Sequence, residues 1–192
     1  MVNPYVAQLR FARSEFKRCL EGVSDEDARK RLLPMNAISW MIGHMASQEQ
    51  FYFVYYPQGK ILYPDLIELV GFGKPGTTPP LNEMWELWED ITKTADEFLD
   101  TVTEDQLSTF LEQDIKGYEH IAFGTVTAEM LAQKTIKSPE NIGTRILRAT
   151  FHYFFHTGEA HAVRQQLGHP DLPYFVGDMP DYLFLGREGY EE

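Results

Sequence analysis

The sequence predicts an all-α protein that forms a single domain over residues 1–192. Apolar side chains recur every three to four residues along four long segments, which is the spacing of an amphipathic helix. Proline or glycine bounds these segments, and neither an internal repeat nor a low-complexity tract interrupts them. A chain of this length is large enough to bury a sizeable core. We therefore expect four long helices packed around that core.

The first predicted helix covers residues 4–20. Pro4 suits its first turn, where no backbone N–H is needed, and Gly22 ends the segment. The side that faces the expected core is apolar: Val6, Leu9, Ala12, Phe16, Cys19 and Leu20. A short helix is expected at residues 24–27, because Ser24 is a favourable N-cap.

The second long helix is predicted to begin after Pro34, with Asn36 as its cap, and to end near Tyr56 before Pro57. At about 100° per residue, His44 points the same way as the apolar side of this helix. The neighbours on that side are Ala37, Trp40, Met41, Phe51 and Tyr55. Gln48 lies on the same side, one turn further along.

A connector rich in glycine and proline, residues 57–80, leads to the third helix, predicted over residues 81–102. Residues 66–70 are expected to form a helical turn within the connector. A connector of this length either contributes to a functional site or serves as a structural crossover. The apolar stripe of the third helix is predicted to be core: Met84, Leu87, Trp88, Ile91, Ala95, Phe98, Leu99 and Val102.

The stretch from residue 103 to residue 137 is the least regular part of the chain. Residues 103–106 have the pattern of a capping box that opens a short helix. Residues 124–127 are expected to form a short extended piece. The fourth long helix is predicted to begin with Ser138 as cap and Pro139 in its first turn, and to run to Leu167.

The fourth helix has two apolar faces. One holds Ile142, Ala149, His152, His156, Ala160, Val163 and Leu167, and the other holds Leu147, Phe151, Phe154, Phe155, Gly158 and Ala162. Both faces cannot pack against the same four-helix core. The second is expected to meet residues 174–184 or another subunit, and since symmetric homodimers are the commonest oligomers, we expect a homodimer.

Three histidines form the candidate metal site. His152 and His156 are four residues apart, so their rings stack on one helix face and can share an ion at about 2.0–2.1 Å. His44 is the third candidate, from a distant helix. A single histidine on an apolar face is usually a core residue, but three buried imidazoles need a partner for every ring nitrogen, and a cation supplies one to each. Three neutral ligands leave coordination positions open, as in reactive sites.

The remaining histidines are weaker candidates, and three other polar residues are stronger ones. His161 faces away from His152, and His120 and His169 fall in predicted loops. The candidate catalytic residues are Glu159, Gln48 and Arg145. Glu159 and Gln48 either hold the imidazole rings or lie as ordinary polar residues at the bundle rim, and Glu159 could also act as a general base on metal-bound water. Arg145 could bind a substrate carboxylate or form a surface salt bridge.

Composition excludes several function classes. The net charge of −12 is spread along the chain, which argues against nucleic acid or an anionic membrane as a partner. Cys19 is the only cysteine, so an internal disulfide and a cysteine-rich zinc site are excluded, and a buried, unreactive thiol is expected. The N-terminus shows no secretory signal, and no run approaches about 18 apolar residues. A cytoplasmic location is therefore expected.

Two motifs resemble those of the DinB-like (DinB/YfiT) superfamily. Residues 38–49 resemble its second-helix motif, and residues 152–159 resemble its fourth-helix motif, His-x-x-x-His-x-Gly followed by Gln; Glu159 stands where Gln is usual. Residues 164–168 also fit the pattern. The resemblance implies an up-down-down-up four-helix bundle with a long crossover between helices two and three. It further implies a divalent metal (nickel, zinc or iron) on His44, His152 and His156, and frequent dimers.

Two function classes follow from these observations. The first is a metal-dependent enzyme that activates water or a small thiol, hence a hydrolase or a thiol-S-transferase acting on a small molecule; the resemblance includes thiol-S-transferases that use small bacterial thiols and a mycothiol-dependent isomerase. The second is a non-catalytic, metal-binding stress-response bundle. A metal-free bundle with hydrogen-bonded histidines is a third possibility. A fourth protein ligand such as Glu159 would favour the binder, and an open position would favour the enzyme.

Overall fold

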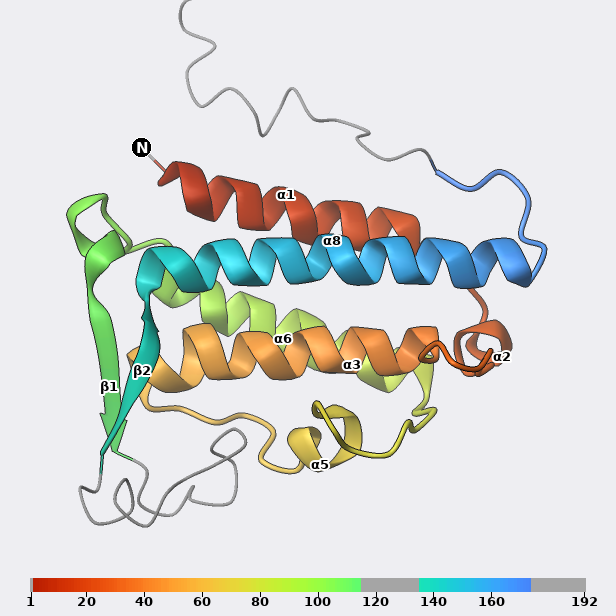
Figure 1. Ribbon diagram of the computed structural model, residues 1–192, viewed down its shortest axis with the longest axis horizontal. Helices are drawn as coiled ribbons and strands as arrows, with labels where there is room; N and C mark the ends of the chain where they lie inside the picture. The colour runs from red at the N-terminus through yellow and green to blue at the C-terminus, as the bar shows by residue number, and fades with distance from the viewer. Residues whose placement is uncertain (1, 115–134, 174–192) are drawn as a thin grey trace, which may run out of the picture.

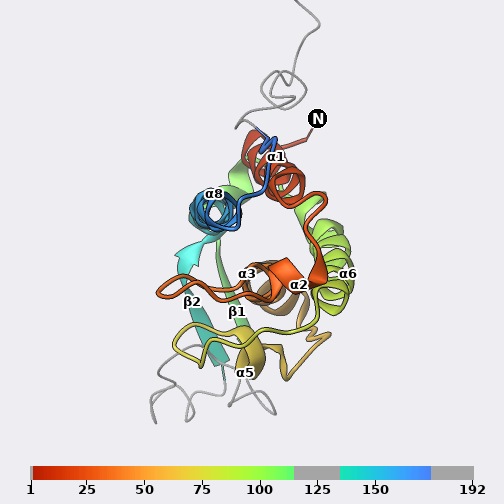
Figure 2. The same ribbon diagram turned by 90° about the vertical axis from the view of Figure 1, so that its right-hand side faces the viewer.

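The computed structural model describes residues 2–114 and 135–173, which are mostly helical with one small two-stranded sheet. This confirms the all-α prediction. Its long helices are α1 (Pro4–Cys19), α3 (Ile38–Glu49), α6 (Leu81–Leu99) and α8 (Ile142–Gln166). They lie side by side in Figure 1 and surround a common centre when seen end-on in Figure 2. Helix α1 packs along α8, α3 packs along α6, and α3 also contacts α8.

The first two helices begin at side-chain caps. The Asn3 side chain accepts a hydrogen bond from the N–H of Tyr5 at the start of α1, and Pro4 occupies the first turn as expected. Ser24 caps α2 (Asp25–Ala28) by accepting from the N–H of Asp27, as the sequence predicts. The apolar residues expected on the core side of α1 are all buried. The periodicity therefore located α1 and its buried face.

The second long segment differs from its prediction at both ends. The cap position of α3 is occupied by Ala37 without a side-chain hydrogen bond, so Asn36 as cap is wrong. After α3 the chain forms a π-helix, η1 (Gln50–Tyr55), and a short α4 (Tyr56–Gln58) that stops at Gly59, where φ is 66°. The wider turns of η1 shift the helical register. As a result Phe51 and Tyr55 pack with Ile67 in a small cluster apart from the main core.

The long connector contains helix α5 (Leu66–Val70), as the sequence predicts, and this helix packs directly on α3. Gly43 allows that close approach. A Cβ atom at this position would lie 2.5 Å from Met84 Sδ and 3.1 Å from Val70 Cγ1. The absence of a side chain on Gly43 therefore lets α5 and α6 press against the middle of α3.

The small sheet pairs β1 (Phe110–Asp114) with β2 (Thr135–Asn141) in antiparallel orientation. Ser138 and Pro139 therefore belong to strand β2, and the predicted helix start at Pro139 is wrong. The cap is Asn141, whose side chain accepts from the N–H of Thr144 at 2.8 Å. A proline is tolerated here because a two-stranded sheet has only edge strands. At its other end α8 closes before Gly168, where φ is 76°.

The remaining predictions fall between or outside these elements. A short 3₁₀-helix, η2 (Asp105–Ser108), begins within the predicted capping box, in which the N–H of Thr103 donates to the Gln106 side chain, and Glu104 occupies the cap position of η2. The extended piece expected at residues 124–127, His120, and the expected contact with residues 174–184 all lie outside the described residues. Across the ranges the structure describes, none of the helices has the length and apolar character needed to cross a bilayer.

A buried polar network ties the four long helices together. Arg13 of α1 donates to Glu49 of α3 through Nε at 2.6 Å and through Nη2, and its Nη1 donates to Asp96 of α6 at 2.8 Å. Glu49 also accepts from the Tyr153 hydroxyl of α8 at 2.7 Å, and Trp88 of α6 donates to that hydroxyl. Glu49 and Tyr153 are fully buried. This network fixes α3 against α8, the two helices that carry the candidate metal ligands.

Candidate metal centre

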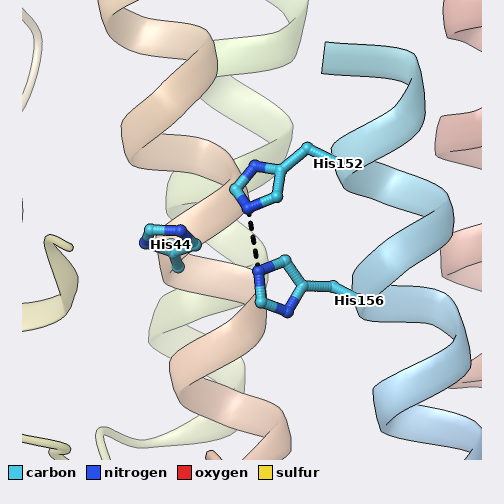
Figure 3. A group of neighbouring side chains, drawn as sticks. All are labelled: His44, His152 and His156. Atoms are coloured by element: carbon cyan, nitrogen blue, oxygen red, sulfur yellow. Dashed lines mark hydrogen bonds between the residues drawn. The ribbon is translucent and has the colours of Figure 1, made fainter. Parts of the chain in front are cut away.

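His44, His152 and His156 meet between α3 and α8. One ring nitrogen of each lies within 4.8 Å of the corresponding nitrogens of the other two. Figure 3 shows His44 projecting from α3 toward the two rings on α8, one turn apart, with the hydrogen bond between His152 and His156 drawn. The structure thus brings the imidazole of His44 to a pair of imidazoles that lie more than a hundred positions further along the sequence.

The His44 ring is held by the crossover segment and by its own helix. Its Nδ1 lies 2.8 Å from the carbonyl oxygen of Val70 at the end of α5. Because a carbonyl oxygen only accepts, Nδ1 carries the proton and Nε2 keeps its lone pair. One turn earlier on α3, Trp40 stacks on the ring with centroids 4.5 Å apart and planes 14° from parallel. The connector therefore contributes to the site by fixing the tautomer of His44.

The His156 ring is held by Glu159, three residues further along α8. Nδ1 of His156 donates to Glu159 Oε2 at 2.8 Å, and the other oxygen of Glu159 accepts from the N–H of Asn36 at 3.1 Å. Burial alone would raise the pKa of Glu159, but the hydrogen bonds from His156 and Asn36 lower it below its ordinary value. Glu159 is therefore a carboxylate that orients the His156 ring and leaves the lone pair on its Nε2, the nitrogen that faces His152.

His152 completes the cluster from the side nearer to solvent. Its Nε2 lies 3.0 Å from Nε2 of His156. Its Nδ1 is buried and has no hydrogen-bond partner among the described residues. In this arrangement one proton lies between the Nε2 atoms of His152 and His156. Among the described residues, His152 lacks the hydrogen bond at Nδ1 that the other two rings have. A cation in place of that proton would satisfy both Nε2 atoms at once.

Burial keeps the imidazoles of His44 and His152 neutral. It lowers the pKa of His44 to about 4, aided by the neighbouring His156 and opposed by the Val70 carbonyl. Burial and the two other histidines lower the pKa of His152 to about 3. Neutral imidazole is the form that binds metals, so the ring nitrogens are available at neutral pH without losing a proton to solvent.

The three residues fit a divalent metal. Two nitrogens bound to one ion at about 2.0–2.1 Å lie roughly 3 Å apart, and the Nε2 atoms of His152 and His156 are already 3.0 Å apart. Two of the rings have the hydrogen-bonded outer partner that metal-binding histidines need. Both oxygens of Glu159 are occupied behind His156. The donor set is therefore three imidazoles, without Glu159 as a fourth ligand.

A pocket of about 1230 Å³ opens beside the cluster, and His44 and His152 form part of its wall. Arg145 and Gln48 also line it, as do the aromatic residues Tyr52, Tyr56, Phe72, Phe151 and Phe155. Phe72, Phe151 and Phe155 are exposed. His156 is not among the lining residues. The three predicted catalytic residues thus fall into two groups. Glu159 contacts His156 on the side away from the other two rings, and Gln48 and Arg145 line the pocket.

Part of the second apolar face of α8 forms the wall of this pocket. Leu147, Phe151 and Phe155 line it, whereas Phe154 turns to α1 and packs edge-on against Phe11 with centroids 6.2 Å apart. The face is therefore divided between the wall of the pocket and a contact with α1. The sequence pattern identified the face but not this division.

The remaining candidates lie elsewhere. Cys19 is buried on α1 with Sγ 3.7 Å from the carbonyl oxygen of Thr157, and burial raises the pKa of its thiol. It shares a separate pocket of about 600 Å³ with His161. His169 lies 3.3 Å from Asp27 near the ends of α2 and α8. An unreactive role for Cys19 agrees with these contacts.

Sequence reasoning missed the residues that support the cluster. Trp40 was assigned only to the apolar face, although its position four residues before His44 is the spacing that allows ring stacking on a helix. The Val70 carbonyl has no signal in the sequence, because every residue has the same backbone carbonyl group. Only the folded chain shows which one lies beside His44. Tyr52 and Tyr56, four residues apart along the second segment, carry the same helical signal but lie where η1 changes the register.

Comparison with known proteins agrees with this geometry. The family model of the DinB superfamily matches residues 8–160, which include most of α1, all of α3 and α6, and both halves of the histidine cluster. The chain therefore belongs to the DinB superfamily. A search of curated proteins found no match.

Proposed function

We propose that this protein is a metal-dependent enzyme with a divalent nickel, zinc or iron ion held by His44, His152 and His156, in an up-down-down-up four-helix bundle. The observation that carries the proposal is the set of three imidazole nitrogens beside a large pocket, with no carboxylate among them. Such a donor set leaves coordination positions open for a small molecule. The side-by-side packing of α1, α3, α6 and α8 and the crossover that carries α5 support the bundle.

The reaction that we propose is hydrolysis or thiol-S-transfer on a small-molecule substrate. A bound divalent ion lowers the pKa of water toward about 7 and favours the thiolate of a coordinated thiol. The residues of the chain supply orientation and water exclusion: Val70 and Glu159 hold two of the rings, and Trp40 shields His44. A low-molecular-weight thiol is the second substrate in the transfer version.

The contacts assign different parts to the predicted catalytic residues. Glu159 is a positioning residue, because its two oxygens are engaged by His156 and Asn36. Gln48 lines the pocket one turn after His44, and its Oε1 is buried without a hydrogen-bond partner in the described part of the chain. Gln48 is therefore placed to accept a hydrogen bond from a bound molecule.

We further propose a cytoplasmic homodimer, which has neither nucleic acid nor membrane as a partner. The spread negative charge supports the absence of nucleic acid. The exposed Phe151 and Phe155 on α8 support a second copy as the partner of that edge, since large apolar side chains seldom gather on the surface of a monomer.

Substitution by Co²⁺ tests the enzyme against the alternative, a non-catalytic, metal-binding stress-response bundle. If the site is open, Co²⁺ binds an added thiol. A sulfur-to-cobalt charge-transfer band then appears in the near-ultraviolet absorption spectrum. Thiol consumption with model electrophiles, and ester or amide hydrolysis without thiol, then separate the two reactions. A cobalt spectrum that no thiol or anion alters would show a closed site and would support the non-catalytic bundle.

A further inference from the structure

The guanidinium of Arg145 is a buried cation whose charge has no carboxylate partner in the part of the chain that the structure describes. The residue is 2% exposed, and its Nε and Nη1 atoms have no hydrogen-bond partner. A buried charge is normally paired, because desolvation without a counter-charge is costly. Burial lowers the pKa of Arg145, while Tyr56, Tyr52 and Glu140 raise it only in part. Two of its donors are thus unused.

Arg148, the next arginine along the same wall, is paired with a carboxylate. Arg148 also lines the pocket, but its Nε donates to both oxygens of Glu140, at 2.7 and 2.8 Å, and its side chain is 57% exposed. Glu140 is therefore already engaged by the exposed arginine. The charges of Arg148 and Glu140 cancel, so among the described residues that line the pocket one positive charge, that of Arg145, is uncompensated.

Aromatic rings fix the orientation of Arg145. Its Cζ atom lies 3.8 Å from the centre of the Tyr56 ring and 5.0 Å from that of Tyr52. Cation–π contacts of this kind hold the guanidinium plane but leave the in-plane donors available. The unused N–H groups at Nε and Nη1 lie on different edges of the guanidinium, so an oxyanion can accept a charge-assisted hydrogen bond from either of them.

The position of Arg145 sets the size of the partner. Arg145 precedes His152 by two turns of α8, which corresponds to about 10 Å along the helix axis. Between them along α8 the pocket is lined by Leu147, Arg148 and Phe151, and Phe72 and Phe155 add apolar surface to the wall. A molecule that bridges the two ends therefore needs a charged group, then an apolar body, then a group that reaches the histidine cluster.

We propose that the pocket binds a small monocarboxylate with an apolar body, whose carboxylate pairs with Arg145 and whose other end lies at the histidine cluster. One free positive charge matches a monoanion better than a dianionic phosphate. The proposal deepens the proposed function by naming its substrate class. The reaction at the cluster rests on that function, but the carboxylate contact does not, because it involves no metal ligand.

Binding of a matched pair of probes tests the proposal. Titration calorimetry compares 4-phenylbutyrate with its neutral amide on the full chain. The acid is expected to bind about tenfold or more tightly than the amide, as a charge-assisted contact requires. The Arg145→Met variant, which keeps the stem over Tyr56, should bind the acid no better than the amide. The double variant Arg148→Met with Glu140→Gln removes the already paired charges of the same wall together, so it should leave acid binding within about threefold.

Several outcomes would overturn the proposal. They are equal binding of acid and amide to the parent protein, no binding of either, an equal loss in Arg145→Met and in the double variant, and tighter binding of 3-phenylpropyl phosphate than of the acid. The comparison of acid with amide on the parent protein needs no variant, so it remains decisive if Arg145→Met does not fold. Circular dichroism identifies that case.

The His156→Ala variant separates this proposal from the metal-dependent function. It removes one ring of the cluster, but His156 does not line the pocket. The acid should still bind to this variant with the same dependence on Arg145. If the unaltered protein binds the acid but no metal, the carboxylate site stands and the enzyme proposal is removed. Metal binding without acid binding would do the reverse.

Discussion

Loss of the buried Arg13–Glu49 ion pair is expected to lower the free energy of unfolding by an amount that the structure allows us to predict. In a Glu49→Leu variant, Arg13 loses two hydrogen bonds and the Tyr153 hydroxyl loses its acceptor, while both residues stay buried. Removing one partner of a buried pair typically costs about 3–5 kcal/mol. Asp96 still contacts Nη1 of Arg13 at 2.8 Å, which places the expected loss near the lower end, about 3 kcal/mol.

Urea denaturation followed by circular dichroism measures this loss. The matched control is Glu89→Gln, which breaks the exposed pair between Glu89 and Lys17 across α6 and α1 and should cost less than about 1 kcal/mol. A double variant, Arg13→Met with Glu49→Leu, removes both buried charges and should recover most of the loss. The reasoning is refuted if Glu49→Leu costs less than about 1 kcal/mol, or if the double variant is less stable than Glu49→Leu alone.

Three further predictions concern the metal site and its supports. Glu159→Ala should weaken metal binding by about 10- to 100-fold, measured by competition with a chelator, because it frees the His156 ring, whereas Glu159→Gln keeps an acceptor and should lose less. Gly43→Ala should lower the free energy of unfolding by about 1–3 kcal/mol in urea denaturation, because the new methyl meets Met84 and Val70; an unchanged midpoint would contradict the close packing. In the metal-free protein, the folded pKa values of His44 (about 4) and His152 (about 3) lie below the ordinary value, so the unfolded chain binds more protons. Stability should therefore be retained above pH 6.5 and decline as pH falls toward 4, and the decline should be shallower in His44→Gln; equal slopes would contradict the burial of this ring.

Local sequence signals located most of the helices and the histidines. Apolar periodicity identified α1 and α6, and side-chain chemistry identified the cap at Ser24. The spacing of His152 and His156 placed both rings on one face, and His44 was placed on the apolar face of its own helix. These inferences succeeded because each depends on contacts within one helix, which the order of residues determines directly.

The errors arose where tertiary contacts override local preference. Ser138 and Pro139 have the pattern of a helix start, yet they lie in strand β2, where its register with β1 shifts, and Asn141 takes the cap. The π-helix η1 is invisible to a constant angle of 100° per residue. Likewise, Arg145 could be placed on the correct helix face, but its lack of a counter-charge depends on Glu140 turning to Arg148, which only the folded chain reveals.

Metal content of the purified full-length chain tests the central claim most directly. After reconstitution with zinc, nickel or iron and removal of excess ion, elemental analysis should find close to one ion per chain. The His44→Ala and His152→Ala variants should lose that ion while keeping the helical circular dichroism spectrum. A parent protein that holds no ion after reconstitution with any of the three metals, or variants that retain as much as the parent, would contradict a metal centre on these three histidines.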